Sequence, residues 1–249
     1  MCSVSLKAAV ASCLAADATG ANCRHDGIPI SDWDVSRVTD MSELFKGARE
    51  FNADISKWNT AAVSRMDYMF RDAWRFNQDI SSWNTAAVTT MYGMFTFAKY
   101  FNQDISKWNT AAVIDMRAMF NGAGYFNQDI SSWNTAAVKN MGAMFAGTKK
   151  FNKDISSWNT AAVTRMDGMF NSATGFNKPL SSWDTSRVTN MFGMFFGATT
   201  FKKDISTWDV MAVTDNAYMW DGADAMTKAY KPCTATGVGA DGTTEWRKC

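Results

Sequence analysis

The sequence predicts a repeat solenoid, a stack of similar coils with a helical cap at its N-terminal end. Three observations predict it: a tryptophan recurs every 25 residues, other apolar columns share that spacing, and no insertion interrupts eight units. A fixed period of roughly 20 to 50 residues indicates a solenoid, propeller or array, and propeller blades need about 40. The tryptophan column contains Trp33, Trp58, Trp83, Trp108, Trp133, Trp158, Trp183 and Trp208.

Residues 1–25 are expected to form the N-terminal capping helix. Leu6, Val10, Cys13 and Leu14 form an apolar stripe at helical spacing, over about residues 5–16. A cap is needed because the end of a solenoid otherwise exposes apolar surface.

Residues 26–225 contain the eight 25-residue units, and each is expected to hold a short strand and a short helix or 3₁₀ segment. Val63, Met66 and Phe70 recur at three to four residues, as on one face of a helix. Thr60 precedes this run, where its hydroxyl could cap free N–H groups. Residues 53–56 place one isoleucine between polar residues, as a half-buried strand does. Stacked units would pair these strands in parallel and share one core.

Residues 226–249 lack the repeat and are expected to form a C-terminal cap or tail. All five cysteines lie outside the regular units, without a CxxC pair or a histidine partner for a catalytic or metal site. One interpretation is that Cys13–Cys23 and Cys233–Cys249 are disulfides in an oxidising compartment, with Cys2 left over. The other is that all five are reduced thiols in an intracellular protein.

The composition excludes several classes of function. Lys and Arg total 25 against 24 Asp and Glu, a net charge of +1, which argues against a nucleic-acid partner. A single histidine leaves little room for general-base triads or multi-histidine metal sites. No stretch approaches the roughly 18 apolar residues of a transmembrane helix. We therefore expect a monomer with no catalytic residue, no metal site and no cofactor.

The repeat pattern FNxDISxWNTxxVxxMxxMFxxA resembles that of BspA-like leucine-rich-repeat surface proteins, a Mycoplasma-type family of unknown function. The similarity covers roughly Asp26 to Ala225. It implies a leucine-rich-repeat-like solenoid of strand and short helix, extracellular or cell-surface display, and a role in adhesion or recognition. The expected partner is a protein or a polysaccharide.

The candidate binding face is a ladder of aspartates and serines on either side of the strand isoleucine. Each aspartate either caps its own turn, which we favour, or contributes to a flat acidic face that binds Ca²⁺ weakly or lies along a glycan. The ladder comprises Asp54, Ser56, Asp79, Ser81, Asp104, Ser106, Asp129, Ser131, Asp154 and Ser156.

Other columns suggest alternatives. The core columns and the asparagines that follow each core phenylalanine are interpreted as structural, with the asparagines bonding neighbouring backbone. The positions equivalent to 64 and 65 change between units, as a surface tuned for protein recognition would. Asp115 and Asp215 are the acidic residues that could make a hydrolase site with paired carboxylates. Regular Ser/Thr ladders allow ice or mineral binding, through the column Thr60, Thr85, Thr110, Thr135, Thr160 and Thr185.

Overall fold

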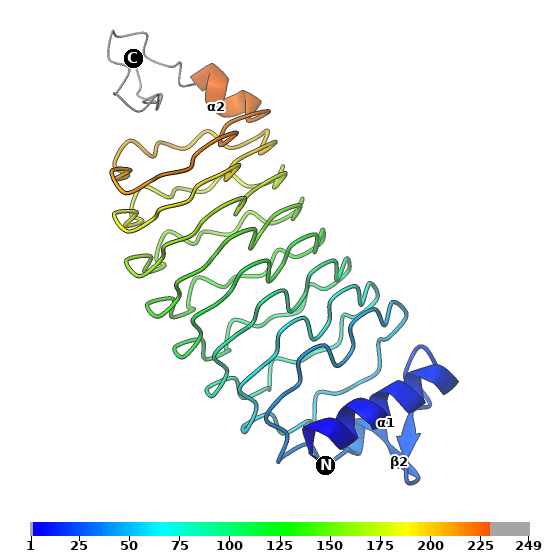
Figure 1. Cartoon of the computed structure of the whole chain (residues 1–249). Helices are drawn as coiled ribbons and strands as arrows, with labels where there is room; N and C mark the ends of the chain where they lie inside the picture. Colours follow the sequence, from blue (N-terminus) through cyan, green and yellow to red (C-terminus); the bar gives the residue numbers. More distant parts are fainter. Residues whose placement is uncertain (1, 230–249) are drawn as a thin grey trace, which may run out of the picture.

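The computed structural model describes residues 2–229, in which coils of 25 residues stack one upon the next from one end of the molecule to the other (Figure 1). Helix α1 lies across the first coils, and helix α2 follows the last one. The elements are α1 (Ser3–Ala16), β1 (Arg24–His25), β2 (Ile28–Pro29), a 3₁₀ helix (Ile30–Asp32) and α2 (Asp224–Ala229).

Helix α1 begins two residues before the expected cap and ends where it was expected. It buries Leu6, Val10 and Cys13 against the first coils, which is the stripe that its sequence spacing indicates. A disulfide joins Cys13 to Cys23, with their Cα atoms 5.3 Å apart. The other expected pair, Cys233–Cys249, lies outside the described residues.

A short antiparallel hairpin connects this cap to the stack. Arg24 pairs with Pro29 and His25 with Ile28. The two residues between the strands, Asp26 and Gly27, have φ of 52° and 78°, as a two-residue hairpin turn with both central residues left-handed requires.

The coils pair through their backbones at a different place from the one expected. Residues 53–56 contain no strand. The parallel bridges instead run through single residues two positions beyond the valine column. The bridges connect Asp40, Arg65, Thr90, Asp115, Asn140, Arg165, Asn190 and Asp215 in sequence.

The segment expected to be helical is a series of overlapping turns. Within one coil Met69 N–H donates to Met66 O at 3.2 Å and Arg71 N–H to Tyr68 O at 3.0 Å. Between them, the N–H groups of Tyr68 and Phe70 donate to the next coil, to Tyr92 O and Met94 O. A helix would use every N–H within its own chain segment. Here alternate groups are exchanged between coils, so no helix forms.

Left-handed residues make this alternation possible. Tyr68 has φ of 54° and Asp72 has φ of 60°, and both positions recur with positive φ in every coil. The residues equivalent to Tyr68 are Glu43, Gly93, Ala118, Ala143, Gly168, Gly193 and Tyr218.

The core is a set of stacked side-chain columns. Trp58 and Trp83 lie with ring centroids 6.5 Å apart and planes 3° apart, and Phe70 stacks on Phe76 at 3.9 Å. Trp83 Nε1–H donates to Ile55 O in the preceding coil at 3.2 Å, which satisfies the buried indole. Each unit therefore relies on its neighbours for both apolar burial and polar satisfaction.

The C-terminal end differs from the interior coils. Trp220 takes the place of a core phenylalanine and stacks on Phe195 at 4.9 Å. Helix α2 adds Met226, which is 2% exposed. Of the expected cap or tail, only residues 226–229 fall within the described part of the chain.

Candidate functional site

The stack presents two long surfaces. We name them by how much their outward residues change from one coil to the next. The constant face consists of the outward residues of 52–62 and their equivalents, where the sequence hardly changes from unit to unit. The variable face consists of the outward residues of 64–75 and their equivalents, where it changes at almost every position.

The asparagine column of the constant face bonds one coil to the next. Asn77 N–H donates to Asn52 Oδ1 at 2.9 Å, and Gln78 Nε2–H donates to Asn52 O at 2.7 Å. The asparagine bond repeats at Asn102, Asn127, Asn152 and Asn177. The expectation that these asparagines bond neighbouring backbone is confirmed.

The aspartate–serine ladder lies in register along the stack, but each carboxylate serves its own coil. Ser56 N–H donates to Asp54 Oδ1 at 2.9 Å, and Ser106 N–H does the same to Asp104. These bonds hold the pKa of Asp54 and of Asp104 below the ordinary value, because they stabilise the charged form. The same turn forms at Asp79–Ser81, Asp129–Ser131 and Asp154–Ser156. In residues 2–229 no three His, Cys, Asp or Glu side chains gather to hold a metal ion.

The threonine column is buried, so it presents no hydroxyl ladder to an ice or mineral surface. Its six members are 1–2% exposed. Thr85 Oγ1 donates to Asn109 O in the next coil at 3.0 Å, so the hydroxyl is a donor between coils. It does not cap N–H groups as the sequence spacing of Thr60 indicates, because the segment that follows is not a helix.

Asp115 and Asp215 also belong to a structural column. Asp115 Oδ1 accepts Arg117 N–H at 2.9 Å, and Asp215 Oδ1 accepts Ala217 N–H at 3.2 Å. Asn140 makes the same turn with Gly142. These aspartates therefore follow the repeated pattern of the coils, whereas a hydrolase site is expected to interrupt that pattern.

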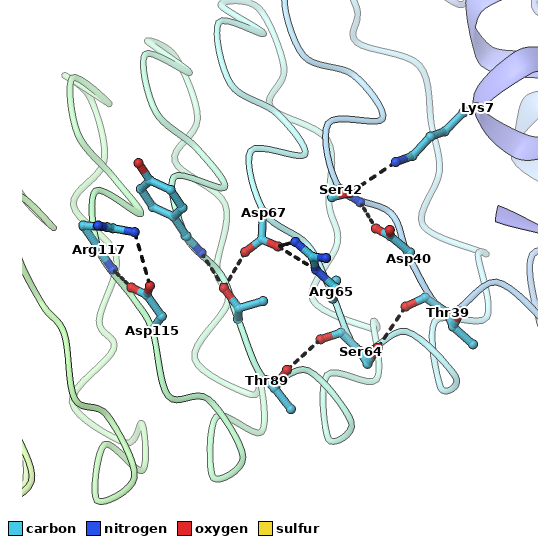
Figure 2. A network of polar contacts seen from close by, with 12 residues as sticks. Lys7, Thr39, Asp40, Ser42, Ser64, Arg65, Asp67, Thr89, Asp115 and Arg117 are labelled. Atoms are coloured by element: carbon cyan, nitrogen blue, oxygen red, sulfur yellow. Dashed lines mark hydrogen bonds and ion pairs between the residues drawn. The ribbon is translucent and has the colours of Figure 1, made fainter. Parts of the chain in front are cut away.

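The variable face holds a shallow, open depression of about 550 Å³ over the first coils. Its polar network crosses several adjacent coils (Figure 2). The lining residues are Ser42, Glu43, Arg65, Asp67, Tyr68, Thr89, Thr90, Tyr92 and Asp115.

One buried carboxylate organises the polar part of this depression. Asp67 is 7% exposed, and Arg65 reaches it with Nη2 at 2.8 Å and Nε at 3.0 Å from Oδ2 (Figure 2). Thr90 donates its hydroxyl to the other oxygen, Oδ1. Asp67 is thus paired with a cation of its own coil and accepts a hydroxyl hydrogen bond from the next coil, and these bonds fix the side chains around it.

A stack of tyrosines and cations forms the other part. The rings of Tyr68 and Tyr92 lie 4.4 Å apart, and the Arg117 guanidinium lies 4.0 Å from the Tyr92 ring centroid. Burial, followed by the hydrogen bond with Tyr92, raises the pKa of Tyr68 to about 12. A Cβ added at Gly93 would meet the Tyr68 ring at 2.5 Å, so a side chain at this position would displace that ring.

The candidate binding face predicted from the sequence is the aspartate–serine ladder, whose carboxylates accept N–H groups of their own turns. Sequence reasoning also singled out the variable positions 64 and 65, and Arg65 lies in the depression. It missed Tyr68, Tyr92 and Arg117. The available signal was that these positions also change from unit to unit and carry large aromatic or cationic side chains.

The fold and this site define a class of repeat protein in which identical backbones carry one constant and one variable face. The chain belongs to the family described as Mycoplasma protein of unknown function, DUF285, whose model matches residues 16–133 and 121–232. No curated protein and no solved structure matches the chain. In the described part of the chain no helix is long and apolar enough to span a membrane.

Proposed function

We propose that the protein is a binding module rather than an enzyme, and that it recognises a macromolecular partner through the variable face. The observation that carries this proposal is the contrast between the faces. Outward residues of the variable face change on a repeated backbone, whereas polar side chains of the constant face bond to neighbouring coils.

The chemistry of the depression favours a protein partner. Tyrosine and arginine are enriched among the residues that dominate protein–protein binding energy. Here Tyr68, Tyr92 and Arg117 lie together and are held by contacts within the protein, so binding would order few new side chains. Most charges nearby are paired, as Arg65 is with Asp67, which suits a mixed polar surface of moderate net charge.

We further propose that the stack is a leucine-rich-repeat-like solenoid of the BspA-like type, displayed outside the cell. The 25-residue period and the parallel bridges support the solenoid assignment. The Cys13–Cys23 disulfide supports an oxidising environment.

Two matched double variants test which face binds. Thr89→Lys/Ile114→Lys places long cations on the variable face, in a column where Lys139 already stands. Ser82→Lys/Ser132→Lys places the same charge on the constant face, in the column of Lys57 and Lys107.

The wild-type protein is first screened against arrays of secreted proteins and glycans to select a bound partner. The variable-face variant should then lose binding to it, while the constant-face variant keeps it, as measured by surface plasmon resonance. Equal binding by the variable-face variant and the wild type, or loss only in the constant-face variant, would overturn the proposal.

A further inference from the structure

A second part of the variable face lies at the end of each variable segment, just before each core phenylalanine. We define the aromatic–basic edge as Arg49, Trp74, Lys99, Tyr100, Tyr125 and Lys149. Its rings are exposed, with Trp74 at 43%, Tyr100 at 42% and Tyr125 at 49%. These rings are therefore accessible to a ligand, whereas core tryptophans such as Trp83 are buried between the tryptophans of the neighbouring coils.

The edge is ordered by contacts within a coil and between successive coils. The Arg49 guanidinium lies 4.8 Å from the Trp74 ring centroid, and Lys99 Nζ lies 5.0 Å from that of Tyr100. The rings of Tyr100 and Tyr125 are 5.2 Å apart. Backbone bonds from Tyr100 N–H to Trp74 O and from Tyr125 N–H to Lys99 O, both 3.2 Å, hold the coils in register beneath them.

The edge carries a local excess of positive charge in a chain whose net charge is only +1. The edge is formed by the positions equivalent to 49 and 50 in each coil. Between residues 49 and 150 the acidic residue at these positions is Glu50, and Arg75 pairs with it at 2.5 Å. Within the described part of the chain, Arg49, Lys99 and Lys149 form no ion pair with a carboxylate. The free charges are thus of one sign, and they complement an anionic ligand.

The spacing of these charges is regular. Arg49, Lys99 and Lys149 are separated by 50 residues, which is two coils. Stacked strands lie about 4.8 Å apart, so alternate coils repeat at about 10 Å. This is close to the length of one disaccharide in an extended polysaccharide.

We propose that the aromatic–basic edge binds an acidic polysaccharide that carries a carboxylate or sulfate on alternate sugars. The three cations pair with successive acidic groups, and the exposed rings pack against the apolar faces of the sugars between them. An acidic peptide fits less well, because it offers the rings no apolar face at that spacing. The inference rests on the proposed binding role and assigns a ligand class to a second part of the variable face.

The first test compares variants that remove the same charge from two surfaces. Lys99→Ser/Lys149→Ser removes two cations of the edge. Lys153→Ser/Lys203→Ser removes two lysines with the same two-coil separation from the constant face. Binding of the full chain to oligosaccharides of hyaluronan, with a carboxylate on alternate sugars, of kappa-carrageenan, with a sulfate on alternate sugars, and of neutral dextran is measured by calorimetry at fixed salt.

The wild type should bind at least one of the two acidic polymers and should not bind neutral dextran. The edge variant should bind at least about tenfold more weakly, and the constant-face variant within about twofold of the wild type. Equal losses in both variants would show binding by overall charge and would overturn the proposal. The absence of binding to both acidic polymers would also overturn it.

A second pair of measurements tests the rings and the polymer class. Trp74→Ala/Tyr100→Ala keeps the net charge and should also weaken binding at least about tenfold. Unchanged binding would overturn the role of the rings, and tighter binding to poly-glutamate than to hyaluronan or kappa-carrageenan would favour a peptide ligand instead. If the depression still binds its partner in each of these cases, only this inference fails and the proposed function stands.

Discussion

The constant and variable faces share one backbone but differ in how far their side chains are repeated from coil to coil. On the constant face, Asn52, Gln78 and Trp83 each bond to a neighbouring coil. On the variable face the coils are joined mainly by backbone bonds, such as Tyr68 N–H to Tyr92 O at 2.8 Å. The asparagine and tryptophan columns that bond between coils hardly change, whereas a backbone ladder accepts almost any outward side chain.

This difference is the reason why we place the proposed ligand on the variable face and not on the uniform columns. Repeated aspartates and serines invite comparison with a repetitive ligand, but Asp104 accepts Ser106 N–H in the way that a turn requires. In a repeat protein, identical residues on successive units are first to be tested as structural. Departures from the repeat at solvent-exposed positions are the better indication of a ligand surface.

The largest expected effect is the loss of a core tryptophan. Trp133→Ala removes a ring that stacks on Trp108 and on Trp158, and with it the hydrogen bond from Nε1–H to Ile105 O. It should lower the free energy of unfolding by about 3 to 5 kcal/mol. Trp74→Ala on the variable face should cost less than about 1 kcal/mol. Urea denaturation followed by circular dichroism measures both. Similar losses of unfolding free energy in the two variants would contradict the assignment of Trp133 to the core and of Trp74 to the surface.

The next effect concerns the asparagine ladder. Asn102→Ala leaves Asn127 N–H without its acceptor, so we expect a loss of about 1 to 2 kcal/mol in the free energy of unfolding. Asn121→Ala on the variable face is the matched control, since Ala146 already occupies the equivalent position. It should cost less than about 0.5 kcal/mol. If Asn121→Ala were the more damaging change, the division between the faces would be wrong.

A smaller effect should have opposite signs on the two faces. Ala143 has φ of 53°, so Ala143→Gly relieves a left-handed alanine and should stabilise the protein by about 0.5 to 1 kcal/mol. Ala136 on the constant face has no such conformation, and Ala136→Gly should destabilise by about 0.4 to 1 kcal/mol. Thermal melts of the two variants against the wild type decide the sign of each change.

The smallest effect per residue is on acid stability. The backbone N–H of Ser106, followed by its hydroxyl, lowers the pKa of Asp104. A lowered pKa stabilises the folded state above the unfolded value of about 3.9, and that stabilisation is lost as the pH falls through the folded pKa. Asp104→Asn keeps the acceptor oxygen but does not titrate. Between pH 6 and pH 3 it should therefore lose less stability in urea unfolding than the wild type, and an equal or larger loss would refute this role.

The amino-acid sequence by itself determined the period, the number of units, the core columns and the helical cap. A 25-residue unit cannot bury a side chain such as Trp133 alone, so the tryptophan column has to be buried between successive units. The sequence also indicated the structural role of Asn52, because a polar residue beside a buried phenylalanine needs a partner.

Only the tertiary structure decided where the coils pair and which surface is free. The left-handed conformation at Tyr68 directs alternate N–H groups to the next coil, and no apolar spacing encodes that choice. It also decided that Thr85 is buried and Trp74 exposed, although both recurring threonines and isolated aromatics are ambiguous in a sequence. The physical reason is that accessibility depends on contacts between units, which exist only once the coils are stacked.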